Sequence, residues 1–391
     1  MATRRAERIL TVRRSDTADA PAFDLSYVRS GPRGATPVVI LPGGPGLASV
    51  RPYRSVRRIA AGGGLDVIMI EHRGIGLSRA DLAGAPLPPS AMRITSVLDD
   101  IAAVLERERI ARAVVVGSSY GSYLASAFGV RHPDRVERML LDSPLQSAAD
   151  LAIERERVRR VFWDAGDGLA ADVRALVGRG EDERSVLDVV RAAYELVGPE
   201  LAGALARRRV RRDASFTWRA LSTYATRGDD IARIPGVYEF DLAGVIAFRE
   251  LAYGAPLDGL PLDPAATYAP LAPRFPAFAG EPYDLPSLTP AFGWPLVVMS
   301  GTRDLRTPPA IAERTTRTAR DAVLISLENG HSALDTHPVA LLNAVRRLVR
   351  GRQYRLPGEA GLLDRLPRRG AGARLPDLFR AMSRAEGLLG R

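Results

Sequence analysis

One serine of this sequence stands in the setting of a catalytic nucleophile. An apolar strand pattern, AVVVGSS, ends in a turn with Gly117 and Gly121 on either side of Ser119, and a run of small residues follows. A serine on a sharp strand-to-helix turn needs glycine two positions before and after it, because the backbone segments approach closely there. Ser118 is the alternative nucleophile, but it lacks glycines in this register. We therefore predict that Ser119 attacks a carbonyl group, with an ordinary glycine-rich turn as the non-catalytic alternative.

A serine hydroxyl needs a base to accept its proton, and the sequence offers four histidines. His72 and His132 come too early in the chain for a base that follows the nucleophile. His337 precedes a proline at the start of a helical pattern, which favours a capping or exposed role. His331 lies in a glycine-containing loop directly after a strand pattern. A loop in that place can present its side chain to the serine, so we predict that His331 is the general base.

A carboxylate must orient the histidine and stabilise its charged form. Asp304 follows the apolar run PLVVMS through a glycine-containing turn, so it is expected at the end of a strand. Asp142, at the end of the earlier run MLLD, is the competing acid, with a turn-forming role before a Ser-Pro pair as its non-catalytic alternative. The order Ser119, Asp304, His331 along the chain favours Asp304.

Negative charge develops on the carbonyl oxygen during attack, and backbone N–H groups can stabilise it. The segment Pro42–Gly46 follows the strand pattern PVVI and offers amides without side-chain obstruction. We predict Gly44 and Tyr120 as the two donors, since Tyr120 directly follows the nucleophile. A merely tight turn would explain the glycines but not their position after this strand.

The elements that must position these residues alternate between strands and helices. This alternation predicts an α/β protein with a mostly parallel central sheet flanked by helices. Ile94–Arg109 and Tyr120–Val130 are helical patterns, the first with apolar residues on one face. Further helices are expected at Pro308–Ala319 and Pro338–Arg350. The predicted strands are Arg8–Arg13, Phe23–Arg29, Pro37–Leu41, Leu65–Glu71, Ala113–Gly117, Met139–Asp142, Leu296–Ser300 and Ala322–Leu327.

The chain divides into four predicted segments. Residues 1–143 form the first part of the sheet core, and residues 294–350 form the second part. Between them, residues 144–293 are rich in Arg, Glu, Ala and Leu at helical spacing and later in proline, which predicts an inserted helical cap with a proline-rich wrap. Residues 351–391 are an Arg/Gly/Pro-rich tail, for which a docked helix and a disordered segment both stay open.

The composition narrows the range of functions. All 55 basic residues are arginine and the formal charge is +10, but the arginines are scattered among 45 acids, which does not favour nucleic-acid binding. The absence of cysteine excludes disulfides and thiolate chemistry. The basic first segment lacks an apolar core and no long apolar run follows, so a cytoplasmic location without membrane contact is expected. The sequence indicates no metal and no organic cofactor.

Three motifs together resemble the proline iminopeptidase family of α/β-hydrolases and its tripeptidyl-aminopeptidase-like relatives. Pro42–Gly46 is similar to the family's His-Gly-Gly-Pro-Gly, with proline in place of histidine. Glu71–Ser78 is similar to Asp-x-Arg-Gly-x-Gly-x-Ser, with glutamate in place of aspartate. Gly117–Gly121 is similar to Gly-Gly-Ser-Trp-Gly, with serine second and tyrosine fourth. The resemblance covers the sheet core but neither the cap well nor the tail.

The resemblance implies an α/β-hydrolase fold and a serine aminopeptidase that releases N-terminal residues or short peptides. In this family, acidic residues of the cap receive the free α-amino group of the substrate. Glu250, in the apolar segment Gly244–Tyr253, is the candidate for that role, with Glu239 behind it. A helix-surface glutamate paired with Arg249 is the alternative interpretation of Glu250.

Two other functions stay open at this point. The same serine, histidine and aspartate would serve an esterase or thioesterase that acts on a small molecule. A non-catalytic receptor built on a hydrolase fold is the third hypothesis. The expected partner is a small peptide or acyl substrate, and neither nucleic acid nor membrane is expected as a partner.

Overall fold

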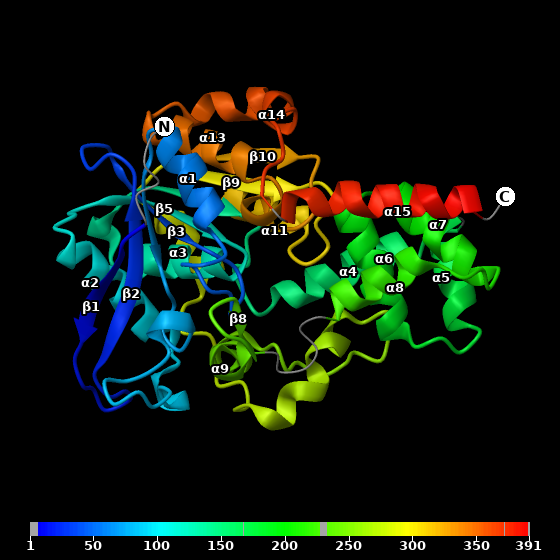
Figure 1. The fold of residues 1–391 in the computed structure, drawn as a ribbon, viewed down its shortest axis with the longest axis horizontal. Coiled ribbons are helices and arrows are strands. Elements are labelled where there is room, and N and C mark those ends of the chain that lie inside the picture. The colour runs from blue at the N-terminus through cyan, green and yellow to red at the C-terminus, as the bar shows by residue number, and fades with distance from the viewer. Residues whose placement is uncertain (1–6, 167, 227–232, 371, 390–391) are drawn as a thin grey trace.

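An eight-stranded sheet forms the centre of this computed structural model, which describes residues 7–166, 168–226, 233–370 and 372–389 (Figure 1). The strand order is β1-β2-β4-β3-β5-β6-β9-β10; β2 is antiparallel to both neighbours and the other pairs are parallel. The strands are β1 (Ile9–Arg14), β2 (Phe23–Ser30), β3 (Pro37–Leu41), β4 (Asp66–Ile70), β5 (Ala113–Ser118), β6 (Val136–Asp142), β9 (Leu296–Gly301) and β10 (Ala322–Leu327).

The mostly parallel α/β sheet and its eight predicted strands are confirmed, with boundaries that differ by at most three residues. Central strands such as β4 and β5 are buried along their whole length. Because both faces of a parallel sheet are covered by helices, its strands are continuous apolar runs, which makes them easy to find in a sequence.

Helices cover both faces of the sheet. One face packs against α2 (Ile94–Arg107), α3 (Tyr120–Arg131) and α11 (Pro309–Thr318). The other face packs against α1 (Arg54–Gly62), α13 (Pro338–Val349) and α14 (Leu356–Asp364). The small residues of α3 let it lie directly behind β5, and ten of its twelve residues are buried. Two buried layers therefore hold the sheet rigid on both sides.

The carboxyl ends of the parallel strands share one edge of the sheet, because these strands run in the same direction. The register pairs Ser118, the last residue of β5, with Asp142, the last residue of β6. The segments that carry Ser119, Asp304 and His331 begin at the ends of β5, β9 and β10. The topology thus brings together residues that are as far as 212 positions apart in the chain.

A helical cap lies beside this edge and has its own apolar core (Figure 1). Its helices are α4 (Asp150–Phe162), α5 (Gly168–Val177), α6 (Glu183–Leu196), α7 (Pro199–Val210) and α8 (Phe216–Ala225). The predicted cap of residues 144–293 also contains a small hairpin of β7 (Arg233–Ile234) and β8 (Tyr238–Glu239). After the hairpin, α9 (Phe240–Leu251) and the proline-rich segment return to the main core through residues such as Ile246 and Leu285.

The tail packs against both the sheet core and the helical cap. Arg368 donates to the side chain of Asn329 at 2.9 Å and to the carbonyl of Glu328 at 3.1 Å, in the loop that carries His331. The last helix, α15 (Leu375–Leu389), lies along the cap and contacts α8 (Figure 1). Of the two possibilities that the sequence left open, the structure shows the docked helix. Residues 1–6, 371 and 390–391 of the predicted terminal segments lie outside the described residues.

Within the described ranges, no helix combines the length and apolar character needed to cross a membrane. The cytoplasmic location stays a prediction.

The carboxylate of Glu386 carries much of the contact between tail and cap, so Glu386→Ala should destabilise the protein. It is buried and accepts bonds from Arg208 at 3.0 Å, from the Ser215 hydroxyl at 3.0 Å and from the Thr217 amide at 2.7 Å. We expect the free energy of unfolding to fall by about 3 kcal/mol, because an arginine and an amide lose their buried partner. Chemical denaturation measures this.

The matched control is Asp377→Ala on the same helix, whose side chain is 79% exposed and forms an ion pair with Arg380. An exposed pair of this kind contributes at most about 1 kcal/mol. Equal effects of the two substitutions would show that the Glu386 contacts do not stabilise the docked tail.

Candidate active site

The backbone of Ser119 turns sharply between β5 and α3. Its φ of 54° and ψ of −122° are unusual for a residue with a side chain. A Cβ atom on Gly117 would lie 2.1 Å from the carbonyl oxygen of Gly121, and one on Gly121 would lie 2.1 Å from that of Leu41. Only glycine fits at these two positions, which is the physical basis of the glycine pattern in the sequence.

The structure brings Ser119, His331 and Asp304 into one hydrogen-bonded chain. The distance from Ser119 Oγ to His331 Nε2 is 2.9 Å, and the distances from His331 Nδ1 to the two carboxylate oxygens of Asp304 are 3.0 and 3.1 Å. Because an ionised carboxylate can only accept, Nδ1 carries the proton and Nε2 accepts from the serine hydroxyl. This tautomer is the one in which the imidazole can remove the proton of Ser119.

The electrostatics of the pair suit this tautomer. Burial disfavours the charged form of Asp304, but the neighbouring His331 and the hydrogen bonds to the carboxylate more than offset burial, so the pKa of Asp304 lies below its usual value. Burial also disfavours the charged form of His331, and the carboxylate of Asp304 more than offsets it, so the pKa of His331 is raised. A carboxylate that stays ionised beside the imidazole stabilises the imidazolium that proton transfer produces.

Thr307 is a second partner of this pair, which the sequence analysis did not identify. Its hydroxyl donates to Asp304 Oδ2 at 2.9 Å and lies 3.3 Å from His331 Nδ1. The amides of Arg306 and Thr307 each donate to Asp304 Oδ1 at 3.0 Å. A threonine three residues after an aspartate is too common a pattern to signal this role in the sequence.

The two predicted oxyanion donors belong to segments that pass beside Ser119. A Cβ atom on Gly43 would be 3.7 Å from Ser119 Oγ, so the Gly43-Gly44 segment passes beside the hydroxyl. Tyr120 begins α3, where a backbone N–H has no partner within the helix. Across the described residues, no acceptor bonds to the amide of Gly44 or of Tyr120. Both amides are thus available to an oxygen atom bound beside Ser119.

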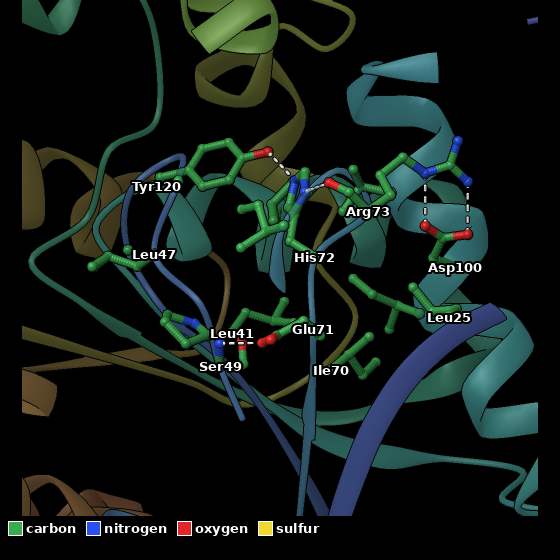
Figure 2. Close-up of a pocket in the computed structure, with 17 residues that line it drawn as sticks. Leu25, Leu41, Leu47, Ser49, Ile70, Glu71, His72, Arg73, Asp100 and Tyr120 are labelled. Atoms are coloured by element: carbon green, nitrogen blue, oxygen red, sulfur yellow. Dashed lines mark hydrogen bonds and ion pairs between the residues drawn. The ribbon is translucent and has the colours of Figure 1, made fainter. Parts of the chain in front are cut away.

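A cavity of about 30 Å³ is lined by residues that include Gly43, Tyr120 and His72. Figure 2 shows the ring of His72 beside the hydroxyl of Tyr120. His72 Nδ1 lies 2.6 Å from the carbonyl oxygen of Arg73, and Nε2 lies 3.1 Å from the hydroxyl of Tyr120. Burial lowers the pKa of His72 to about 4, so the ring is neutral, donates through Nδ1 and accepts from the tyrosine. His72 therefore holds the side chain of Tyr120 in place.

Glu71 lines the same cavity and supports the glycine-rich loop, which is the segment Pro42–Gly46 (Figure 2). Its Oε2 accepts the amides of Ser49 at 2.6 Å and Val50 at 2.9 Å, three to four residues beyond Gly46. A glutamate thus stands where the resembled motif has aspartate, and its carboxylate anchors the loop that contains Gly44.

The predicted role of Glu250 is not supported by its contacts. Its Oε2 accepts the amide of Ile94 at 2.8 Å, and its Oε1 pairs with Arg249 at 2.8 Å. A helix N-terminus favours negative charge, so this buried carboxylate joins α9 to the start of α2. Glu239 is likewise engaged, by the amide of Gly76. Neither carboxylate is free to receive the α-amino group of a substrate.

A different cap acid, Glu154 on α4, interacts electrostatically with Asp304. Burial raises the pKa of Glu154 to about 7, against the opposing effect of Arg191 and Arg306, and the negative charge of Asp304 contributes to the rise. The charge of Glu154 also helps to raise the pKa of Tyr253. The hydroxyl of Tyr253 lies 3.3 Å from the carbonyl oxygen of Gly44. The sequence analysis missed it because Glu154 is one of several glutamates in an Arg/Glu-rich helical segment.

Residues 36–243, more than half of the chain, match the family described as alpha/beta hydrolase fold. The chain belongs to this family. The matched region contains the sharp turn at Ser119 and the glycine-rich loop with Gly44, and it ends within the cap.

Individual relatives of this α/β-hydrolase include proline iminopeptidases. The chain is 25% identical to the proline iminopeptidase of Heyndrickxia coagulans over 173 residues, which are 44% of this chain and 55% of that protein. The chain therefore spans about half the length of the curated relative that it matches. The resemblance found in the motifs is confirmed at this level.

Solved structures show the same fold at low sequence identity. The proline iminopeptidase of Mycobacterium smegmatis is 18% identical, with 89% of this chain and 99% of that chain covered and a TM-score of 0.52. The esterase RhEst1 of Rhodococcus sp. ECU1013 is 17% identical, with 87% and 98% covered and a TM-score of 0.50. These structures support the fold and do not distinguish a peptidase from an esterase.

The close approach of Gly121 to Leu41 predicts that Gly121→Ala destabilises the protein. The added Cβ would lie 2.1 Å from one backbone oxygen, which only a shift of α3 or of the glycine-rich loop relieves. We expect a loss of about 1–3 kcal/mol, measured by chemical denaturation. The control is Gly358→Ala in α14, which meets no atom within 4 Å and should leave stability unchanged or raise it by up to about 1 kcal/mol. A stability of Gly121→Ala equal to that of the control would contradict the packing described for the turn.

Proposed function

We propose that this α/β-hydrolase is a serine hydrolase that forms an acyl-enzyme at Ser119. The observation that carries the proposal is the continuous hydrogen-bonded chain from Ser119 through His331 to the buried carboxylate of Asp304. A serine hydroxyl becomes a useful nucleophile only with such a base, and the base needs the carboxylate to hold its tautomer.

The reaction proceeds in two halves. His331 Nε2 takes the proton of Ser119 as Oγ attacks the carbonyl carbon, and the amides of Gly44 and Tyr120 stabilise the oxyanion. The tetrahedral intermediate collapses when His331 gives that proton to the leaving group. Water then attacks the acyl-enzyme with His331 again as base, and release of the acid regenerates Ser119. The chemistry needs no metal or organic cofactor.

The first test is Ser119→Ala. We expect turnover to fall by about 10³-fold or more, because no other group can form the acyl-enzyme, while the melting temperature stays near that of the unchanged protein. A fluorophosphonate probe should label the unchanged protein and not the variant. Retention of full activity by a folded Ser119→Ala protein would refute the proposal, and a complete lack of labelling in the unchanged protein would favour a non-catalytic receptor.

For the substrate, we propose peptides with a free α-amino group, with Glu154 as the residue that receives the ammonium. The proposal is supported by the resemblance to proline iminopeptidases and by the electrostatic interaction of Glu154, a cap residue, with Asp304 and Tyr253. A buried ammonium needs a carboxylate partner, and Glu154 is only partly satisfied, with Arg191 at 3.4 Å. The partner of the enzyme would then be a small peptide, and an ester or thioester of a small molecule is the alternative substrate.

Glu154→Gln should raise KM for an amino-acyl substrate by about tenfold and leave KM for the N-blocked substrate unchanged. In the unchanged protein, KM for the free-amine substrate should fall as pH rises through about 7, because Glu154 must lose its proton to pair with the ammonium. An α-amine with a pKa of about 7.7–8.0 is still mostly charged there.

The matched control is Glu156→Gln on the same helix, whose side chain is 66% exposed. It should leave both constants unchanged. If blocked and free substrates respond equally to Glu154→Gln, or if the unchanged enzyme prefers the blocked or ester substrate, the aminopeptidase assignment is wrong and the esterase function takes its place.

A further inference from the structure

Asp142, the rival acid of the sequence analysis, is fully buried at the end of β6 and has a different set of partners from Asp304. Its Oδ1 accepts the amide of Ala333 at 3.0 Å, and its Oδ2 accepts the amide of Leu334 at 3.0 Å and the hydroxyl of Ser118 at 2.7 Å. A buried carboxylate needs several donors to remain ionised, and here all of them come from two segments. These segments are the turn before the nucleophile and the chain directly after the base.

A second contact joins the same two segments. The hydroxyls of Ser118 and Ser332 are 2.9 Å apart, and they belong to the residue before Ser119 and the residue after His331. The Ser119–His331 contact and this contact therefore join the same two segments at neighbouring residues. Because the Ser118 proton goes to Asp142, Ser118 can only accept from Ser332, whose hydroxyl also lies 2.8 Å from Asp335 Oδ2. Asp142 is thus bonded to the serine that contacts the loop of the base.

Ser143, the residue after Asp142, extends this attachment. Its hydroxyl accepts the amide of Ser332 at 2.9 Å, and it is also hydrogen-bonded to Asp304, which helps lower the pKa of that carboxyl. The backbone of Ser143 is held by a bond from its amide to the carbonyl of Met299 at 2.8 Å. The end of β6 thus contacts the loop of the base and the loop of the acid.

We infer that Asp142 is a positioning residue that holds the His331 loop against the turn of Ser119 and so sets the geometry of proton transfer. This inference rests on the proposed function. A misplacement of about 1 Å between reacting groups can cost on the order of 100-fold in rate, so a carboxylate that touches no substrate can still control turnover.

The charge of Asp142 also affects the pKa of the base, His331. Burial raises the pKa of Asp142 to about 6, against the effect of its three donors and of His331. The charge of Asp142 also raises the pKa of Tyr53, and the carboxylate of Asp335, bonded to Tyr53 and to Ser332, is a further charged group beside these partners. Because the negative charge of Asp142 also stabilises the charged form of His331, its removal should lower the pKa of the base. A residue with only a structural role would not change that pKa.

The test is Asp142→Asn, which keeps the shape of the side chain but cannot accept all three bonds. We expect kcat to fall by about 10- to 100-fold with KM within about twofold, and the acid limb of the pH profile of kcat/KM to move to lower pH. The rate of fluorophosphonate labelling of Ser119 should fall in parallel with kcat.

The matched control is Asp66→Asn, at the opposite edge of the sheet. Asp66 is also fully buried and is bonded by Arg29, so its loss should destabilise the protein without a change in kcat. If Asp142→Asn does not fold, Ser118→Ala serves in its place, because it removes the Ser118–Asp142 and Ser118–Ser332 bonds and leaves both loop amides paired. It should lower kcat by at least about threefold.

Three outcomes would overturn the inference. The first is a folded Asp142→Asn variant whose kcat lies within twofold of that of the unchanged protein, and the second is an equal loss of kcat in Asp66→Asn. The third applies where only Ser118→Ala folds, and it is an unchanged kcat in that variant. The failure of the proposed function is a separate result, because it is read from Ser119→Ala and from probe labelling of the unchanged protein.

Discussion

The left-handed backbone of Ser119 is the constraint on which the arrangement of the site depends. Such a conformation costs on the order of 1–3 kcal/mol, so its surroundings must hold it. The amide of Ser119 donates to the carbonyl of Asp142 at 2.9 Å, and its carbonyl accepts the amide of Ser122 at 2.8 Å. Gly117 and Gly121 allow β5, α3 and the glycine-rich loop to close around the turn. The turn therefore directs the Ser119 hydroxyl toward His331.

The loop of His331 is held from three directions, which explains how a residue on an irregular segment can keep a hydrogen-bonding geometry. Asp304 bonds to the imidazole, Asp142 bonds to the amides that follow it, and Arg368 of the tail bonds to the loop before it. The tail continues to the cap, where Glu386 is buried. Parts of the chain outside the sheet thus contribute to the position of one side chain.

The cap is attached to the sheet core at a few points, some of them beside Asp304, while it keeps its own apolar core. Glu195, near the end of α6, accepts the amide of Leu305 at 3.1 Å and pairs with Arg306 at 3.2 Å, directly beside Asp304. Glu250 attaches α9 to α2 in a similar way. These two buried acids attach the cap to the sheet core, whereas Glu154 pairs with Arg191 within the cap, at 3.4 Å.

Sequence patterns were enough to predict the sheet and the residues at its edge. Apolar runs between turns locate the strands, glycines locate the turn at Ser119, and the ends of parallel strands must meet, so Ser119, Asp304 and His331 could be predicted as neighbours. Tertiary structure alone decided which carboxylates are engaged. Glu154 and Glu250 occur in helical segments whose orientation no local pattern reveals, and the partners of Asp142 are distant in the chain. His337 stands at the N-cap position of α13 as expected, without a side-chain capping bond, but it is fully buried because the tail covers it. Local signals reflect backbone geometry, whereas the burial and pairing of a charge depend on packing between distant segments.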